Sequence, residues 1–473
     1  MPSISLQGAA SVSSRRRLAL WTVLTAQLML QMDFLIVLVA LPRIQQDLGF
    51  SPAALSWVPN AFALAFGGLL LLGGRLGDMI GQVRVFRLGL TIFVLASLLG
   101  GLAQTPGVLV AARLLQGIGA ALAAPSVLAL VTVMARDEAE RARGLSLFIA
   151  VSSIGAASGL ILGGVLTDFL SWRWSLLINV PVGLVVVALI GRLVAETSPK
   201  PSRLDLGGAV TATLGSVGLV HGFIHAAESG WGNLGTLLSF CIAAVLFTAF
   251  FRIEARHKTP LLDLGLLRDR PRRAALAVMG LIVGMHFAVL FMLVQFLQRV
   301  LGFSPLMAGL AYVPLTVTVF AVTHFVPRLV GRFGPRVLLI AGSVLVAISL
   351  LLLALMDESS RYFPGVLMPL LVHAVGIALV FAPGTVAIMQ GVADAHAGTA
   401  SGLLQMDQQI GGALGIAVIA AVYARGAEPG HFTPGLSTSF LAAAAIALVA
   451  AMLALGALKH MRGESRSTQG STP

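Results

Sequence analysis

The chain has 473 residues, of which 57% are hydrophobic and only 11% are charged. Water-soluble domains carry about 25% charged residues, so this chain has too few polar side chains to cover a soluble surface, and its mean hydropathy of +0.94 agrees. A formal net charge of +12 is compatible with a nucleic-acid partner, but the position of the basic residues argues against it. They separate apolar runs and form no patch with aromatic residues, so a lipid bilayer is the expected partner.

Apolar runs long enough to cross a bilayer, about 20 residues each, follow one another along the whole chain. The first, Leu18 to Leu41, is longer than the apolar region of a signal peptide and lacks a small-residue cleavage site, so we expect a permanent span. A β-barrel would show short alternating segments instead. The fourteen predicted spans lie near residues 18–41, 52–73, 85–104, 108–134, 144–167, 175–194, 207–226, 234–251, 273–298, 306–331, 336–356, 363–390, 398–423 and 435–458.

The loops between these spans alternate in charge. Cytoplasmic loops of membrane proteins carry an excess of Lys and Arg, and here the excess lies on the side that holds the N-terminus. The opposite side keeps Arg43, Arg173, Arg299, Arg361 and Arg425. This pattern predicts an even number of spans and two cytoplasmic termini. A composition rich in Ala, Gly, Arg and Leu with only three lysines suggests a high-GC bacterial source, so we expect the protein in the bacterial cytoplasmic (inner) membrane.

A short internal echo suggests a duplicated bundle. Residues 74–81 resemble residues 327–334, and both segments lie between the second and third spans of their half. Parallel repeats of this kind are a transporter architecture with the substrate site between the halves. The predicted organisation is a cytoplasmic N-terminal tail (1–17), a six-helix bundle (18–200), two linker helices (201–255), a second six-helix bundle (256–460) and a disordered cytoplasmic tail (461–473).

Five motifs appear in order on the expected spans. Asp33 precedes the Ala40-Leu41-Pro42 end of the first span. The loop 74–84 reads G-x-L-x-D-x-x-G-x-x-R, and 113–117 reads R-x-x-Q-G. The fourth motif is the Gly-rich segment 155–164. The fifth is the pattern W-R-W…I-N-x-P-x-G at residues 172–183.

Together these motifs resemble the major facilitator superfamily, in its branch of fourteen-helix drug:proton antiporters (EmrB/QacA-like multidrug efflux transporters). The resemblance implies an all-α membrane fold of two six-helix bundles related by pseudo-two-fold symmetry, plus two intervening helices. It implies a secondary active exporter of amphipathic drugs or antibiotics, working by alternating access as a monomer. Such a protein is not an enzyme and needs no cofactor beyond the proton motive force. The chain has no P-loop sequence that would indicate ATP-driven export.

Some residues depart from the family pattern. Leu160 stands where the antiporter motif usually has proline, and Leu35 and Leu38 stand where the first span usually has Thr and Asn. These departures leave open a second interpretation, a facilitator or importer of a small metabolite on the same scaffold.

Asp33 is the central candidate for proton coupling. A charged Asp near the centre of a membrane helix costs about 2.5–3.5 kcal/mol on insertion scales, and such acids are functional by default. At 1.5 Å per residue, Asp33 lies about 12 Å and Arg113 about 8 Å from the same outer side, so their depths are compatible. The alternative is a static pair that only fixes helix packing.

Asp407 is the other acid inside a predicted span, at a position where the family usually has a small hydroxyl residue. It can recognise a cationic substrate, take a second proton, or be an acid satisfied by neighbouring Gln residues. The remaining substrate-cavity candidates are the glutamines Gln27, Gln31, Gln116, Gln295, Gln390 and Gln405.

The conformational motifs supply a third group of candidates. Glycines spaced by four let helices approach closely, and the loop 74–84 is predicted to act as a cytoplasmic latch with Asp78 at a helix N-terminus. These residues are Gly74, Asp78, Gly81, Arg84, Gly155, Gly159, Gly163 and Gly164. His221 and His225 lie four apart, but no third ligand is apparent and no metal site is expected.

Overall fold

The computed structural model describes residues 4–199, 204–257, 260–262, 264–392, 397–428 and 431–457, and these form helices joined by short loops. The helices are α1 (Ile4–Leu48), α2 (Trp57–Ile80), α3 (Gln82–Gly101), α4 (Pro106–Val133), α5 (Glu138–Phe169), α6 (Trp174–Leu177), α7 (Asn179–Leu193), α8 (Leu206–Ser229), α9 (Leu234–Arg256), α10 (Arg270–Arg299), α11 (Pro305–Ala311), α12 (Val313–Ala354), α13 (Leu367–Met389), α14 (Ala397–Gly426) and α15 (Thr433–Ala457). Single turns lie at η1 (Ala54–Ser56), η2 (Leu266–Arg268) and η3 (Tyr362–Val366).

Thirteen of the described helical stretches are long and apolar enough to cross a membrane. One of them, Pro305–Ala354, has 50 residues, about 75 Å at 1.5 Å per residue, which is more than twice the hydrocarbon thickness of about 30 Å. Gly334 breaks this stretch with non-helical backbone angles (φ 76°, ψ 159°). The two parts match the predicted spans 306–331 and 336–356, so the structure is compatible with fourteen spans.

The first helix is longer than the apolar run that predicts it. It has 45 residues and begins at Ile4, so the N-terminal tail predicted for residues 1–17 is helical from Ile4 onward. The predicted C-terminal tail, 461–473, lies outside the described residues.

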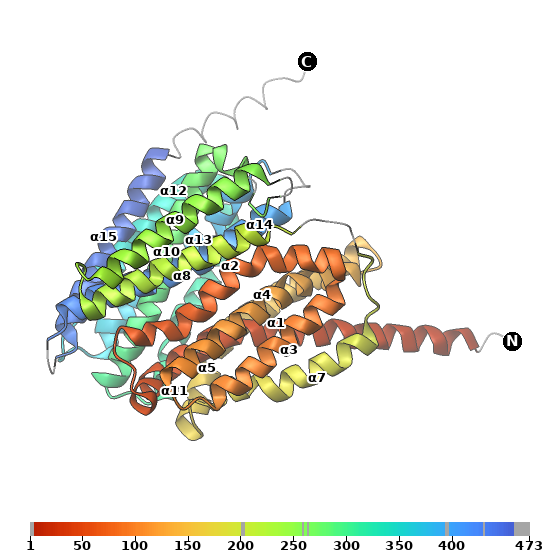
Figure 1. Cartoon of the computed structure of the whole chain (residues 1–473), viewed down its shortest axis with the longest axis horizontal. Coiled ribbons are helices and arrows are strands. Elements are labelled where there is room, and N and C mark those ends of the chain that lie inside the picture. The colour runs from red at the N-terminus through yellow and green to blue at the C-terminus, as the bar shows by residue number, and fades with distance from the viewer. Residues whose placement is uncertain are drawn as a thin grey trace, which may run out of the picture. The chain divides into compact units, whose positions relative to one another are not determined.

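The chain divides into two compact units. The first holds the residues up to Phe50, Trp57–Thr213 and Ser304–Leu310; the second holds Ser51–Ser56, Leu214–Phe303 and the residues from Ala311 on. Within the first unit α1 packs against α4, α5 and α7, and within the second α10 packs against α13, α14 and α15 (Figure 1).

Glycines bring one helix pair in each unit into backbone contact. In the first unit, Cβ atoms added to Gly159 and Gly163 of α5 would lie 2.9 and 2.3 Å from the Met32 and Ile36 carbonyl oxygens of α1. In the second unit, a Cβ on Gly415 of α14 would lie 2.2 Å from the Gly284 carbonyl oxygen of α10. The same pairing, first helix with fifth helix of a bundle, therefore recurs, as a repeated architecture requires.

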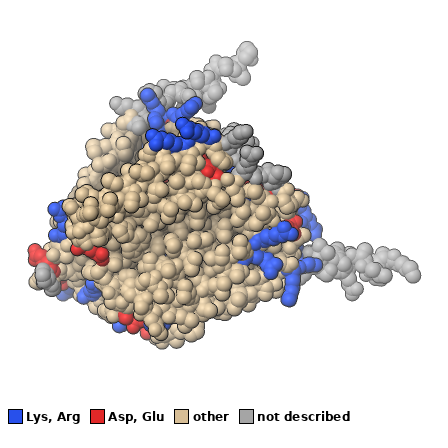
Figure 2. All heavy atoms as spheres, in the orientation of Figure 1, with Lys and Arg blue, Asp and Glu red and all other residues tan. Residues whose placement is uncertain are grey.

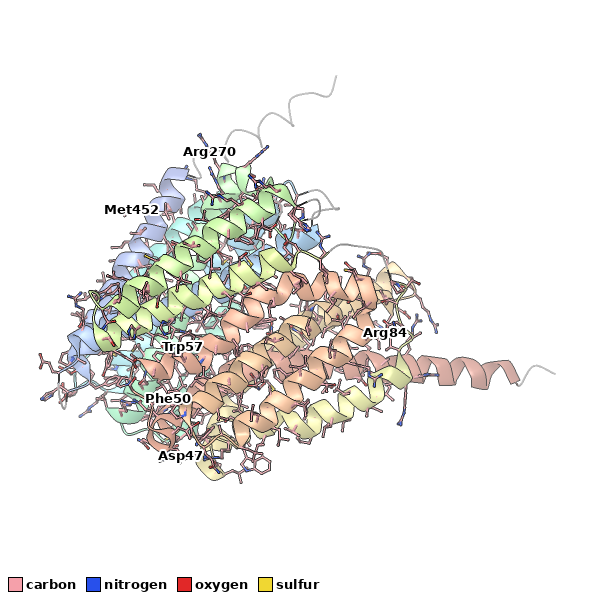
Figure 3. The ribbon with its side chains drawn as sticks, in the orientation of Figure 1. Asp47, Phe50, Trp57, Arg84, Arg270 and Met452 are labelled. Carbon is pink, nitrogen blue, oxygen red and sulfur yellow. The ribbon has the colours of Figure 1, made fainter. Side chains whose placement is uncertain are left out.

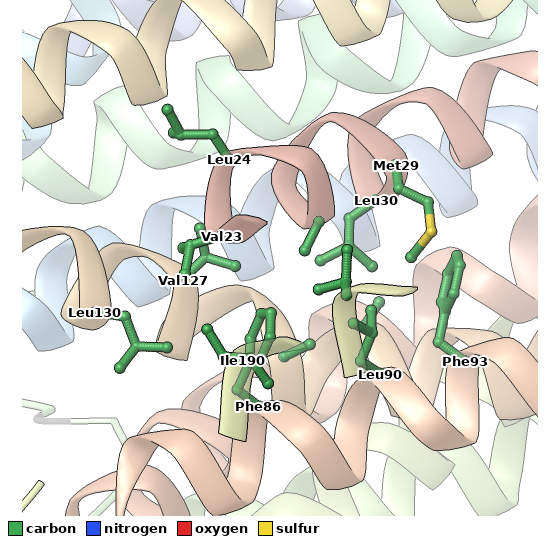
Figure 4. Packing of buried hydrophobic residues seen from close by; sticks show 14 of the residues in the cluster. Val23, Leu24, Met29, Leu30, Phe86, Leu90, Phe93, Val127, Leu130 and Ile190 are labelled. Carbon is green, nitrogen blue, oxygen red and sulfur yellow. The ribbon is translucent and has the colours of Figure 1, made fainter. Parts of the chain in front are cut away.

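The core of the first unit is an apolar cluster of buried side chains from five helices, α1, α2, α3, α4 and α7 (Figure 4). Each helix turns one apolar side inward, and Phe62 and Phe93 are among the fully buried members. The labelled contributors are Val23, Leu24, Met29 and Leu30 of α1, Phe86, Leu90 and Phe93 of α3, Val127 and Leu130 of α4, and Ile190 of α7.

Charged side chains gather at the helix ends of each unit, and the helix surface between those ends is uncharged on the face drawn in Figure 2. In the first unit, Asp47 and Arg84 lie at opposite ends (Figure 3). This distribution suits helices whose middle parts face lipid and whose ends face water.

Candidate functional site

Asp33 and Arg113 form a fully buried ion pair in the first unit. Both side chains are 0% exposed, and Arg113 Nη1 donates to Asp33 Oδ2 at 2.5 Å. The predicted match in depth between α1 and α4 is confirmed by this contact. The proton-coupling role of the pair stays a prediction.

Two amides complete the environment of the carboxylate. Gln116 Nε2 donates to Asp33 Oδ1 at 3.0 Å and to Ser97 Oγ at 2.8 Å. Asn179 Nδ2 donates to the same Oδ1 at 2.7 Å. Every partner of the carboxylate in this structure is therefore a donor.

The guanidinium of Arg113 is held on several sides as well. Its Nε donates to the Val58 carbonyl at 3.1 Å, its Nη1 also donates to Gln116 Oε1 at 2.9 Å, and its Cζ lies 4.6 Å from the centre of the Phe62 ring. Nη2 is buried without a hydrogen-bond partner among the described residues. The cation thus has one unused donor beside a carboxylate that already accepts from three side chains.

Protonation of Asp33 affects its two carboxylate oxygens differently. Oδ1 already accepts from Gln116 and Asn179, so a proton there must displace one of these donors, whereas Oδ2 accepts only from Arg113 and keeps a second lone pair. Because Asp33 is 0% exposed, water does not reach it in this conformation. Proton exchange at Asp33 therefore requires the helices around it to rearrange.

Sequence reasoning missed Asn179 and Ser97 as members of the site. Asn179 is the first residue of α7 and belongs to the I-N-x-P-x-G motif, so the motif was the available signal. Ser97 lies within α3 and also donates to the Phe93 carbonyl at 2.7 Å, a local bond that gives no sign of its contact with Gln116.

The W-R-W part of the motif at 172–183 binds the C-terminal end of α1, at the end of the unit away from Arg84. Trp172 Nε1 and Arg173 Nη1 donate to Asp47 Oδ2 at 2.9 and 2.6 Å (Asp47 is labelled in Figure 3). Arg173 also donates to the Ala103 carbonyl at 3.2 Å. The motif therefore joins α1, the α3–α4 loop and the segment before α7 at one end of the unit.

The glycine stripe of α5 fixes the helix that carries Asp33. Gly155, Gly159 and Gly163 face the α1 backbone at Leu28, Met32 and Ile36, on both sides of Asp33. Gly164 instead faces α11, where an added Cβ would lie 2.7 Å from the Pro305 carbonyl oxygen. The sequence prediction that small residues allow close helix approach is confirmed for Gly155, Gly159 and Gly163.

We expect the change Gly163→Ala to destabilise the protein. Its Cβ would meet the Ile36 carbonyl oxygen at 2.3 Å, and overpacking of this kind costs about 1–3 kcal/mol. The measurement is thermal unfolding of the purified protein in detergent. Gly107→Ala is the matched control, because a Cβ there meets nothing within 4 Å; equal unfolding temperatures for the two variants would contradict the prediction.

The segment 74–84, predicted as a loop, consists of the end of α2, Gly81 and the start of α3. A residue that the sequence prediction did not include holds it in place. The Glu196 carboxylate accepts from the backbone N–H groups of Val83 and Arg84, each at 3.0 Å, and so binds the N-terminus of α3. Its Oε2 also lies 3.8 Å from Arg84 Nε.

The sequence analysis predicted that Asp78 lies at a helix N-terminus, and this prediction is wrong. Asp78 lies in the last turn of α2 and accepts from Gln82 Nε2 at 3.0 Å. Gly81 has φ 105°, a conformation that favours glycine, while a Cβ added to Gly74 would meet only Pro125, at an ordinary contact distance of 3.6 Å. The latch role of Gly74, Asp78, Gly81 and Arg84 stays a prediction.

In the second unit, Asp407 lies on α14 against α10. A Cβ added to Gly280 would lie 2.9 Å from Asp407 Oδ1, so glycine makes room for the carboxyl group. Oδ2 is buried without a hydrogen-bond partner among the described residues, so no Gln side chain satisfies it. Gln405, two residues earlier, is exposed.

The remaining glutamines are not brought together. Gln27 donates to Ser152 Oγ at 2.9 Å, and Gln31 lies beside Gly155 at the contact between α1 and α5. Gln295 donates to the Phe291 carbonyl of its own helix at 3.2 Å. Gln390 is exposed at the C-cap of α13, where its carbonyl accepts from Arg272 at the start of α10. Gln295 and Gln390 therefore lie near opposite ends of α10.

Within the described residues, no group of three His, Cys, Asp or Glu side chains could hold a metal ion. The His221 and His225 rings stack at 5.6 Å, and His221 Nδ1 lies 2.9 Å from Ser239 Oγ. These contacts are those of packing residues between α8 and α9.

Comparison with known proteins agrees with the fold. Residues 23–416 match the family model of the Major Facilitator Superfamily. The chain is 38% identical over 463 residues to the cephamycin export protein CmcT of Amycolatopsis lactamdurans, covering 95% of this chain and 94% of that protein. It is 38% identical over 414 residues to the puromycin resistance protein of Streptomyces alboniger, covering 86% and 82%.

Among solved structures, the crystal structure of a peptide transporter in complex with sulfate is similar in fold. It has a TM-score of 0.69 at 14% identity, over 92% of this chain and 93% of that one. The long apolar helices, the ordered motifs and these matches lead to one assignment. The chain belongs to the major facilitator superfamily and is a multi-pass membrane transporter, not an enzyme.

Proposed function

We propose that this protein is a proton-coupled antiporter that exports amphipathic drugs or antibiotics by alternating access. The observation that carries the proposal is the buried Asp33–Arg113 pair, an acid inside a membrane-spanning helix with a complete set of donors. The printed names of two similar proteins, a cephamycin exporter and a puromycin resistance protein, support a drug-like substrate.

The proposed cycle alternates between two states of Asp33. In the state described here Asp33 is ionised and paired; in the other, helix rearrangement admits water, a proton binds, and Arg113 keeps its contacts with Val58 and Gln116. One charge crossing the membrane supplies about 2.3 kcal/mol per 100 mV. That is enough to drive modest substrate accumulation before the pH gradient is added.

The proposal includes the setting of the protein. We place it in the bacterial cytoplasmic membrane as a monomer with both termini in the cytoplasm, as the basic loops indicate. Alternating access would be carried out by the two six-helix bundles, 18–200 and 256–460. Asp407, with its unpaired buried oxygen, is proposed to contact the substrate or a second proton.

The test uses everted membrane vesicles that carry an imposed pH gradient. Puromycin or a cephamycin is added, and a pH-sensitive dye reports the gradient; vesicles from cells that lack the protein are the control. Substrate-dependent dissipation of the gradient supports antiport. Substrate uptake that leaves the gradient unchanged would instead favour the facilitator that Leu160, in place of the motif proline, leaves open.

A further inference from the structure

Three polar side chains from three helices of the second unit form a chain of hydrogen bonds. His286 of α10 and His373 of α13 lie with Nδ1 and Nε2 at 3.1 Å, and His373 Nδ1 lies 3.0 Å from Ser349 Oγ of α12. The two rings stack, with centres 5.4 Å apart and planes at 14°. Neither histidine has a part in the proton cycle proposed for Asp33.

The donor and acceptor of each hydrogen bond among Ser349, His373 and His286 follow from one contact. The Ser349 hydroxyl donates to the Val346 carbonyl at 2.7 Å, so it has no second hydrogen and must accept from His373 Nδ1–H. A neutral imidazole has one donor and one acceptor, so His373 Nε2 accepts. His286 Nδ1 therefore donates.

This assignment leaves one nitrogen open. In neutral His286 the remaining atom, Nε2, is an acceptor, and no hydrogen-bond partner for it is found among the described residues. A proton can bind there without breaking the chain, because the imidazolium still donates through Nδ1. A second added proton, on His373 Nε2, would place two N–H groups against each other at 3.1 Å. The pair therefore holds one extra proton.

The burial of the two rings agrees with unequal roles. His373 is 0% exposed, while His286 is partly exposed. Phe287 and Phe381 contact the His286 ring, with centres 5.6 and 6.4 Å away. His373 is thus the member that the helices enclose completely, while part of the His286 side chain stays accessible.

Few other ionisable groups lie close to the pair. Asp407 faces Gly280, six residues or about 9 Å along α10 from His286, and Tyr312 donates to the Leu290 carbonyl at 3.0 Å, about 6 Å along the same helix. The described part of α15 carries no ionisable side chain. The others on the packed elements lie farther along their helices or are exposed: Arg270, Arg272, Arg273 and Arg299 of α10, His324, Arg328, Arg332 and Arg336 of α12, Arg361 and Tyr362 beside η3, and Tyr423 and Arg425 of α14.

We propose that His286 is a proton-binding residue of the second unit, taking one proton at Nε2, and that His373 and Ser349 are the residues that position it. Intramembrane ionisable residues are functional by default, and imidazole is the side chain that changes charge near neutral pH. The site would serve the proposed proton-driven export, and in that sense it rests on the proposed function. Its existence as a proton site does not depend on transport.

The test is nitrogen-15 NMR of the full chain in lipid nanodiscs with labelled histidine. At high pH we expect both rings to carry hydrogen on Nδ1, and scalar coupling across the N–H···N bond assigns the pair without a variant. On acidification from about pH 8 to about pH 3.5, His286 should become an imidazolium while His373 stays neutral. His286→Asn, which keeps a donor near the Nδ1 position, should remove one titrating ring.

Two matched variants sharpen the outcome. His324→Asn, on the exposed side of α12, should remove one independent ring and leave the pair unchanged. Ser349→Ala should release the fixed tautomer of His373, an effect that a merely structural serine would not produce. Two separately titrating rings, a His286 that carries its hydrogen on Nε2, or no titration in this range would overturn the proposal. Each of these results is distinct from a failure of drug-dependent proton flux in vesicles.

Discussion

Replacing Asp33 by Asn is expected to abolish gradient-driven export while the protein stays folded and inserted. Asn has nearly the shape of Asp and keeps an oxygen that can accept from Asn179 and Gln116, but it cannot bind and release a proton. It also leaves the buried Arg113 cation without its carboxylate, so we expect a loss of stability that lowers the amount of protein without unfolding all of it. For one charge moved across 100 mV, the accumulation ratio should fall from about 50-fold to about one. The measurement is substrate accumulation in energised vesicles, normalised to the amount of protein in the membrane.

The control for this variant is Asp168→Asn, which removes an acid from the exposed end of α5. Its accumulation ratio should equal that of the unaltered protein. If the Asp33 variant also accumulates substrate at the unaltered ratio, Asp33 has no part in energy coupling and the pair is a static packing element.

Replacing Arg113 by Leu is expected to destabilise the protein by about 3–5 kcal/mol, because it leaves a buried carboxylate without its cation. Gln116 and Asn179 alone would then support the charge of Asp33. The Val58 carbonyl would also lose its donor. Unfolding by heat or denaturant in detergent micelles, followed by circular dichroism, measures the loss.

Two further variants separate this cause from lost packing. In Arg113→Leu combined with Asp33→Asn no charge is left unpaired, so much of the stability should return. Arg141→Gln removes an exposed ion pair, with Glu138 at 3.7 Å, and should cost about 0–1 kcal/mol. An Arg113→Leu protein as stable as the Arg141→Gln protein would contradict the prediction.

The helical fold and the central pair could be predicted from the sequence for simple reasons. Apolar runs of bilayer length define spans directly, and a fixed rise per residue converts the positions of Asp33 and Arg113 into depths. Glycines spaced by four on α5 likewise indicate a close helix contact, which the structure confirms at Gly159 and Gly163.

The sequence does not show which side of an apolar helix faces its neighbours. In a span with lipid on one side and protein on the other, both sides are hydrophobic, so rotation about the axis leaves no clear pattern. His286 and His373 therefore read as two isolated histidines, although their nitrogens lie 3.1 Å apart. Gln295 and Gln390 were grouped by residue type and lie near opposite ends of α10.

The latch shows a second limit. Motif reasoning concentrated on Asp78, which the pattern contains, while the carboxylate at the start of α3 belongs to Glu196, which lies beyond α7 and outside the motif. Glu196 is more than a hundred positions from the start of α3 in the sequence, so the sequence around α3 does not indicate which residue caps it.

The glycine contacts between α1 and α5 restrict how Asp33 can become accessible. They recur every four residues on both helices, so the two helices fit together only at alignments one turn, about 6 Å, apart. Small sliding between them is blocked, and the pair must travel as one rigid body unless it jumps a whole turn. Water can therefore reach the Asp33 carboxylate only if α4 or α7 moves, because these two helices contact the carboxylate only through side-chain hydrogen bonds.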